Sequence, residues 1–130
     1  MKNWLTLMIV ASASLLIGAD EATYVAHDKV AEALTKGGPL GSTKEYTVSG
    51  AHRDKAGQVE VHEKETDILY VTDGDATFVT GGTMVGGKMS KAGQWLGTDI
   101  TGGQTHHLVK GDVVMVPRVC RIGSKRSPSQ

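Results

Sequence analysis

Short runs of β-branched and aromatic residues, separated by glycine-containing turns, constrain the fold of this chain more than any other feature. Five such runs follow residue 44, and they span 45–48, 58–62, 68–72, 76–79 and 113–116. Runs of this length and composition are typical of β-strands. Asp73-Gly74 lies between two of them and predicts a tight hairpin, because glycine accepts the positive φ that a primed turn requires. Several short strands in a chain of 130 residues predict one small all-β sandwich or barrel.

One amphipathic helix is expected before the first of these strands, over residues 28–36. Asp28 can cap its first turn, Val30 and Leu34 share one face at helical spacing, and Gly37 begins the Gly-Gly-Pro sequence that ends it. The region before the strands therefore holds a single helix of two to three turns.

Two glycine-rich segments interrupt the strand pattern. The stretch from Gly81 to Gly103 alternates weakly and carries Trp95, and we interpret it as a long hairpin or an excursion from the strands. Gly111 marks a second turn, directly before the run 113–116. The sequence therefore predicts that turns, and not helices, connect the strands.

The two ends of the chain differ from the body in composition. Residues 1–19 place Lys2 before an apolar run and end in Gly18-Ala19, which predicts a secretory signal peptide and a periplasmic or secreted protein. An uncleaved membrane anchor is the alternative. Residues 118–130 hold four basic side chains and no acid. We interpret this segment as a solvated tail without strand periodicity, because it lacks the interleaved aromatics of a nucleic-acid-binding segment.

Composition excludes several classes of site. Cys120 is the single cysteine, so neither an intramolecular disulfide nor a zinc site of several thiolates can form. The sequence carries 14 basic and 14 acidic residues, so no overall charge attracts nucleic acid or an anionic membrane. We therefore expect no nucleic-acid partner, and no membrane partner once the leader is cleaved.

Glu60, His62 and Asp67 are the candidate metal ligands. Glu60 and His62 are two residues apart on one predicted strand, so both side chains leave the same face. Asp67 opens the next predicted strand five residues later. If these strands are adjacent, the two carboxylates and the imidazole converge on a mixed oxygen and nitrogen set that suits Fe, Mn, Zn, Ni or Cu. Solvated strand residues are the alternative for each of the three.

The spacing of these residues resembles the first motif of the cupin family, G-x5-H-x-H-x3-4-E-x6-G. In this chain Glu60 stands at the place of the first histidine, His62 at the second, Asp67 at the glutamate and Gly74 at the final glycine. Gly111-x5-Pro117 resembles the start of the second motif, G-x5-P-x-G-x2-H-x3-N. The resemblance covers about residues 46–117. It implies an all-β, cupin-like antiparallel barrel or sandwich after one short N-terminal helix.

Departures from the family pattern fall at both motifs. Asp54 stands where the first motif begins with glycine, and Val119 and Ile122 stand where the second motif has glycine and histidine. The codons GGT-GTG-CCG-CAT, for Gly-Val-Pro-His, become GTG-TGC-CGC-AT on loss of one G. The shortened frame reads Val-Cys-Arg and begins Ile, which is the sequence of residues 119–122. We therefore expect a frameshift after Arg118 and missing C-terminal strands.

The sequence predicts an order of domains but leaves the choice of function open. Residues 1–19 form the leader, 20–43 a helix and linker, 44–117 a cupin-like domain and 118–130 the basic, frameshifted tail. The resemblance implies a divalent metal and a small organic ligand. It leaves open whether the chain is an enzyme impaired by its altered C-terminus or a non-enzymatic ligand-binding cupin, and whether it pairs with a second copy as a homodimer by strand exchange. Fold alone does not choose among these functions.

Other chemically capable side chains have plainer interpretations. His52 is expected in a surface loop. His106 and His107 are adjacent on a strand, so at most one of them points inward. Cys120 has no recognisable partner for nucleophilic chemistry. Trp95 is interpreted as a hydrophobic plug more readily than as a shield over the pocket.

Overall fold

The computed structural model describes residues 21–125, so the predicted leader and the last five residues lie outside the described part. The chain divides into two compact units, Met1–Ala51 and His52–Gln130. We call their described parts the helix–hairpin unit and the sandwich unit. The division falls after residue 51, because the strand Thr47–Gly50 pairs with the strand Gly38–Ser42 within the first unit. No helix among residues 21–125 is long and apolar enough to cross a membrane.

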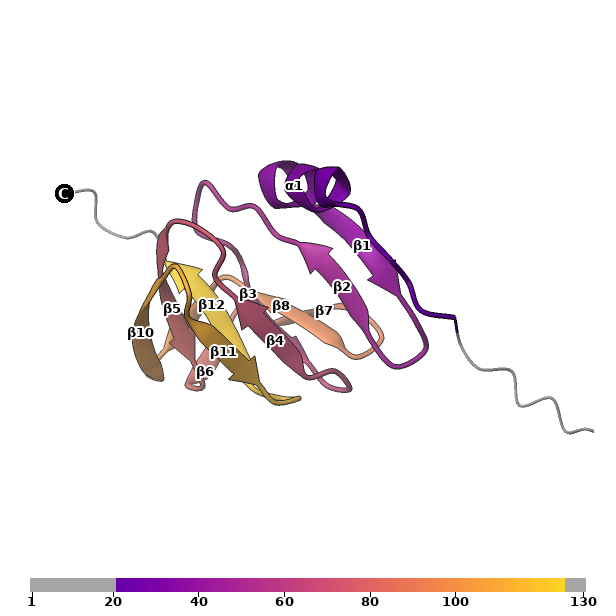
Figure 1. Ribbon diagram of the computed structural model, residues 1–130. Helices are drawn as coiled ribbons and strands as arrows, with labels where there is room; N and C mark the ends of the chain where they lie inside the picture. The colour runs from indigo at the N-terminus through magenta and orange to yellow at the C-terminus, as the bar shows by residue number, and fades with distance from the viewer. Residues whose placement is uncertain (1–20, 126–130) are drawn as a thin grey trace, which may run out of the picture. The chain divides into compact units, whose positions relative to one another are not determined.

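The helix–hairpin unit holds helix α1 (His27–Lys36) and the antiparallel strands β1 (Gly38–Ser42) and β2 (Thr47–Gly50) (Figure 1). The predicted helix is confirmed, and Gly37 ends it with a φ of 75°. The prediction that Asp28 caps the helix is wrong. Ala26 occupies the N-cap position and provides no side-chain cap. Asp28 lies inside the first turn, where its negative charge interacts favourably with the positive end of the helix dipole.

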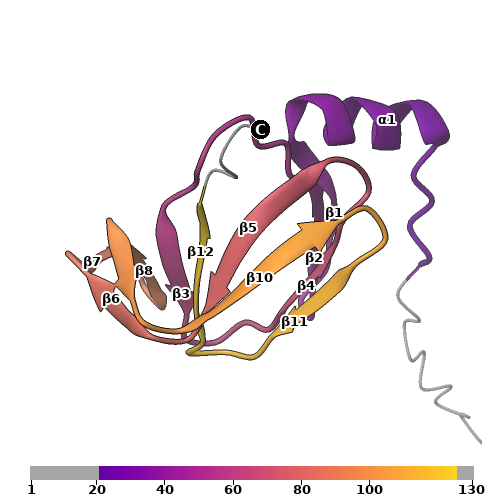
Figure 2. The same ribbon diagram turned by 90° about the vertical axis from the view of Figure 1, so that its left-hand side faces the viewer.

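The sandwich unit contains ten strands arranged in three sheets. In chain order they are β3 (Val59–His62), β4 (Asp67–Tyr70), β5 (Asp75–Thr80), β6 (Thr83–Val85), β7 (Lys88–Lys91), β8 (Gln94–Gly97), β9 (Asp99–Thr101), β10 (Gln104–Val109), β11 (Val113–Val116) and β12 (Arg121–Lys125). The largest sheet has the order β10-β5-β12-β3-β8-β7, and the pairs β11-β4 and β6-β9 form two smaller sheets. The described pairs are antiparallel and the sheets do not close into a barrel (Figure 2). The all-β expectation is confirmed at this level.

Two turn predictions had different outcomes. The glycine-rich stretch from 81 to 103 is a nested hairpin, in which β7 pairs with β8 inside the pair of β6 with β9. The hairpin predicted at Asp73-Gly74 is wrong: Gly74 has a φ of 75°, but β4 pairs with β11 while β5 pairs with β10 and β12. A local turn reverses or redirects the chain there without pairing the strands on either side of it.

The apolar core of the sandwich unit lies on both faces of the six-stranded sheet. Between this sheet and the β4–β11 pair, Phe78, Leu108, Val116 and Ile122 form one buried cluster. On the opposite face, a second cluster consists of Val59, Val79 and Ile100, with Met84 packed against it. The β6–β9 hairpin supplies Ile100 and Met84 and so covers that face.

The interpretation of residues 118–130 as a solvated tail without strand periodicity is wrong for 121–125. These residues form β12, which pairs with β3 on one side and with β5 on the other. Ile122 is 5% exposed and belongs to the core between the sheets. The segment shows no strand periodicity in the sequence because most of its residues are basic or small. Its one apolar side chain, that of Ile122, is nevertheless enough to hold a short central strand in the core.

Candidate metal centre

The two faces of β3 have different environments. Val59 and Val61 are buried, whereas Glu60 and His62 are half-buried on the other face. Glu60 stands opposite Ile122 of β12 in the strand register, and directly opposed residues in an antiparallel pair project to the same face. Because Ile122 packs against Val116 of the β4–β11 pair, Glu60 and His62 lie on the inner face of the sandwich.

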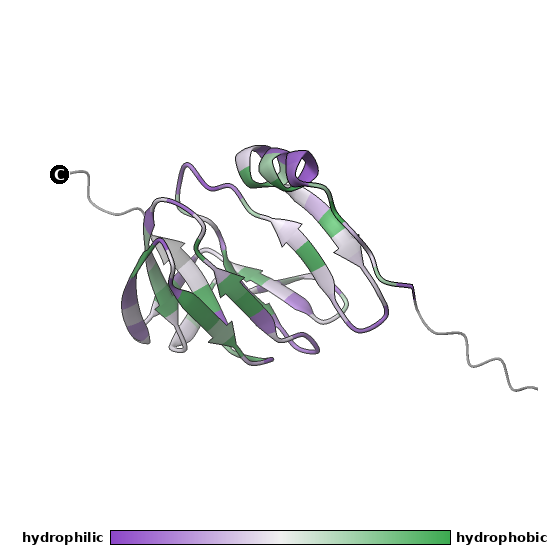
Figure 3. Cartoon of the chain, viewed as in Figure 1, coloured by the Kyte–Doolittle hydropathy of each residue, from purple (hydrophilic) through white to green (hydrophobic). Residues whose placement is uncertain are grey.

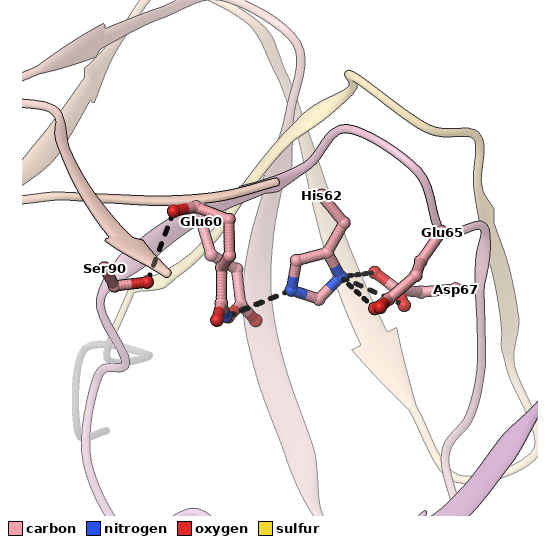
Figure 4. A network of polar contacts seen from close by, with 6 residues as sticks. Glu60, His62, Glu65, Asp67 and Ser90 are labelled. Atoms are coloured by element: carbon pink, nitrogen blue, oxygen red, sulfur yellow. Dashed lines mark hydrogen bonds and ion pairs between the residues drawn. The ribbon is translucent and has the colours of Figure 1, made fainter. Parts of the chain in front are cut away.

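The loop from β3 to β4 brings two carboxylates to the Nδ1 side of the His62 imidazole. Nδ1 lies 3.0 Å from Asp67 Oδ2 and 3.6 Å from Glu65 Oε2 (Figure 4). One donor atom from each of these three residues lies within 4.8 Å of the other two. His62 and Asp67, which the sequence placed in one site, therefore do meet.

The other ring nitrogen of His62 faces a separate pair of side chains. Its Nε2 lies 3.2 Å from Gln94 Nε2 and 3.8 Å from Glu60 Oε2. Gln94 is opposite His62 in the β3–β8 register, and its amide nitrogen is 3.5 Å from Glu60 Oε2. Ser90 Oγ donates to the backbone carbonyl of Gln94 at 3.3 Å, which ties β7 to β8 beside the site.

The imidazole ring separates the three predicted ligands into two groups. Asp67 lies on the Nδ1 side and Glu60 on the Nε2 side, as Figure 4 shows. A single ion bound to one ring nitrogen of His62 is therefore adjacent to Asp67 or to Glu60, but not to both in this arrangement. Glu65, which was not predicted as a ligand, lies on the same side of the ring as Asp67. The sequence feature that could have identified it is its position three residues after His62, across a short loop.

The charge around the ring is negative. Glu60, Glu65 and Asp67 each have a carboxylate oxygen within 4.0 Å of a nitrogen of His62. No lysine or arginine forms an ion pair with these three carboxylates within residues 21–125. The side chains of His62 and Asp67 are 18% and 26% exposed, so they are partly shielded, whereas Glu65 at 67% lies largely in solvent.

The other histidines of the sandwich unit are not members of this cluster. His52 is exposed in the loop before β3. His106 Nε2 is 3.0 Å from Thr80 Oγ1, and this histidine is half-buried. His107 is exposed and 4.0 Å from an Asp75 carboxylate oxygen. The expectation that at most one member of the pair points inward is confirmed.

The contacts of Trp95 and Cys120 indicate structural roles for both residues. Trp95 stands opposite Val61 and so lies on the face of the sheet away from His62, where its indole N–H donates to Glu63 Oε1 at 2.7 Å. It does not cover the candidate site. Cys120 is half-buried and packs against the core cluster of Phe78 and Ile122.

Comparisons with known proteins add no assignment to this geometry. The chain matches no family model, no curated protein and no solved structure.

Proposed function

We propose that this protein is an exported, cupin-like domain that binds a divalent metal through His62 Nδ1, Asp67 and Glu65, and a small organic ligand beside that metal. The observation that carries the proposal is the convergence of one imidazole nitrogen and two carboxylates at 3.0 and 3.6 Å. Donors that share an ion at bond lengths of about 2.0–2.2 Å lie roughly 3–3.5 Å apart, so little movement is needed to admit a cation.

Charge supports a cation at this place more than a hydrogen-bond network alone. A neutral imidazole holds one proton and can satisfy one carboxylate at a time, whereas three carboxylates surround the ring. A divalent ion neutralises two of them. One nitrogen and two oxygen donors suit Zn, Mn, Fe, Ni or Cu, and three protein ligands leave positions for water or for an oxygen of a small ligand.

The backbone near the second motif supports the family part of the proposal. Val119 has a φ of 58°, a conformation that β-branched residues rarely adopt and that glycine adopts without strain. Its backbone N–H donates to the carbonyl of His62 at 2.7 Å. The cupin pattern has glycine at this position, and its histidine falls on Ile122, which is opposite Glu60. Of the two departures of the second motif, the one at residue 119 thus falls where the family's glycine would adopt the observed backbone conformation without strain.

Calorimetric titration of the metal-free chain with Zn²⁺ and with Mn²⁺ tests the metal site. We expect one ion per chain, and we expect His62→Ala and Asp67→Asn to weaken binding at least tenfold. Glu60→Gln is the matched control within the cluster, since Glu60 lies on the other side of the ring, and His107→Ala is the control for an exposed histidine near a carboxylate. Neither control should change the affinity more than twofold.

Imidazole ¹⁵N spectra identify the nitrogen that binds. Metal at Nδ1 of His62 should leave the proton on Nε2. An ion bound at Nε2, or an affinity lost with Glu60→Gln and retained with Asp67→Asn, would contradict the assignment. If neither Zn²⁺ nor Mn²⁺ binds, the metal site itself is overturned.

A second arm of the same titration restores the motif residues. Val119→Gly should stabilise the chain by about 1–2 kcal/mol, since it removes left-handed strain. Ile122→His should destabilise the fold because Ile122 is in the core. Residue 122 is opposite Glu60, on the Nε2 side of His62, so Ile122→His should leave the affinity of the Nδ1 site within twofold of the original value. A tenfold gain in affinity in Ile122→His would place the ion on the Nε2 side and contradict the assignment.

The alternative is a cupin-like protein that binds a small ligand without metal. The observation in its favour is that both His62 ring nitrogens already have hydrogen-bond partners, Asp67 and Gln94. Thermal-shift measurements with small carboxylic acids and sugars, with and without EDTA, separate the two. Stabilisation that persists in EDTA supports the alternative, and stabilisation that requires the metal supports the proposal.

A further inference from the structure

The outer face of the β4–β11 pair is apolar and exposed. Ile68 and Tyr70 of β4 are 71% and 64% exposed, and Val113 and Met115 of β11 are 56% and 74% exposed. The register pairs Ile68 with Met115 and Tyr70 with Val113, so the four side chains form one contiguous patch. We call it the outer patch. Figure 3 shows both strands largely in the colour of hydrophobic residues.

This exposure is not the usual pattern of a two-faced strand. Leu69 and Val114 project to the other face and pack against the core cluster, so both faces of the pair are apolar. Antiparallel strands with one solvated face normally alternate apolar and polar residues. The one charged residue of the two strands, Asp67, is opposite buried Val116 and therefore belongs to the inner face. Apolar residues on both faces indicate a strand pair that is covered on both sides.

We infer that the outer patch is the interface of a symmetric homodimer, in which the β4–β11 pairs of two copies pack face to face. This inference is independent of the metal site. It differs from strand exchange, because each copy keeps its own strands and contributes only the outer face.

The exposed area agrees with a dimer. A fully exposed residue of this size presents roughly 150–250 Å², so the four residues expose roughly 500 Å² at the fractions above. Two copies would then bury roughly 1,000 Å² from these side chains, which is about the minimum area of a specific interface. The largest apolar patch on a typical monomer is about 300–600 Å² and is often functional.

A second copy fits the patch better than a charged or extended partner. The outer patch has no charged side chain to recognise a nucleic acid, an anionic lipid or an acidic peptide. Flat sheet faces pack on one another about 10 Å apart, and two-fold dimers are the commonest assemblies of identical chains. The 14 basic and 14 acidic residues of the sequence balance, so no net charge opposes the approach of two copies.

Sedimentation velocity and light scattering over a concentration series, in EDTA, test the dimer apart from any metal. We expect a mass that rises to twice that of the single chain. Met115→Asp should raise the dimer dissociation constant at least tenfold. Met89→Asp is the matched control, because Met89 is an exposed methionine on β7 of a different sheet, with 56% of its surface exposed. Circular dichroism and cooperative unfolding establish that both variants are folded.

A distance measurement separates this interface from any other route to a dimer. Spin labels on Met115→Cys in a Cys120→Ser background should give strong dipolar coupling between copies, and labels on Met89→Cys in the same background should not. A monomer at every concentration overturns the inference. So does a dimer whose dissociation constant Met115→Asp and Met89→Asp raise equally.

Discussion

The helix–hairpin unit and the sandwich unit are stabilised in different ways. The sandwich unit buries two clusters of apolar side chains, one on each face of its six-stranded sheet. In the described part of the helix–hairpin unit, the buried residues are Ala33 and Gly50. A Cβ on Gly50 would overlap the backbone carbonyl oxygen of Ala33, so α1 and β2 meet backbone to backbone.

This difference predicts where each unit is sensitive to substitution. A side-chain core tolerates exchange of similar apolar residues but loses stability when volume is removed. A backbone contact has no side chain to remove, and is instead disrupted by adding atoms. Removal of side-chain volume should therefore be the damaging change in the sandwich unit, and addition of a methyl group the damaging change where α1 meets β2.

Phe78→Ala should have the largest effect. Phe78 is 8% exposed in the cluster between the sheets, and truncation of a buried phenylalanine costs about 3–5 kcal/mol. That is a large part of the about 5–15 kcal/mol by which domains are stable. Urea unfolding followed by circular dichroism measures it. Tyr46→Ala, at a residue 60% exposed, is the control and should cost little. Equal losses in the two variants would mean that the cluster does not carry the stability.

Gly50→Ala should have an intermediate effect confined to the helix–hairpin unit. The added methyl forces α1 away from β2, at a cost of about 1–3 kcal/mol, as for other overpacked sites. Amide hydrogen exchange of residues 33–37 should accelerate, with no change in β3 or β5. Gly41→Ala is the matched control, because its Cβ would meet only Thr23 Cγ2 at 3.8 Å. Acceleration in both variants, or in neither, would refute the backbone contact.

The smallest effect concerns the charges on α1. Hydrogen bonds from Lys36 and then Lys29 hold the pKa of the Glu32 carboxyl below its ordinary value. A carboxyl group whose pKa is lower in the folded state stabilises that state above its unfolded pKa, and this contribution is lost as pH falls through the folded value. The Glu32 side chain is exposed at the surface, so salt screens the effect. Carboxyl ¹³C titration should give a higher pKa in Lys36→Met, and an unchanged value would contradict this cause.

Sequence patterns predicted elements more reliably than their pairing. The helix and the strand at Val113–Val116 were predicted within one residue, because apolar periodicity and terminating glycines are local signals. The hairpin at Asp73-Gly74 was not correct, because glycine chemistry specifies a turn but not the partner of the strand that follows. Which strands pair is decided by tertiary packing, here by the core that β4 and β11 cover together.

The candidate site shows the same division. Periodicity placed Glu60 and His62 on one face, and spacing brought Asp67 close to His62. Spacing does not determine how a ring is turned, so it could not separate Glu60 from Asp67. Glu65 is in a loop without periodicity, and the loop path that brings it near His62 follows from the positions of both strands.

The central place of β12 has a consequence for biosynthesis. In the six-stranded sheet, β5 and β10 form one part, β3, β8 and β7 form the other, and β12 is the strand that joins them. Residues 121–125 emerge from the ribosome after all the other strands. Until then, the sheet consists of two separate parts, and the edges that β12 will later cover are unpaired. Unpaired edges of this kind readily pair with strands of other chains. The nascent sandwich unit should therefore depend on chaperones until β12 is released.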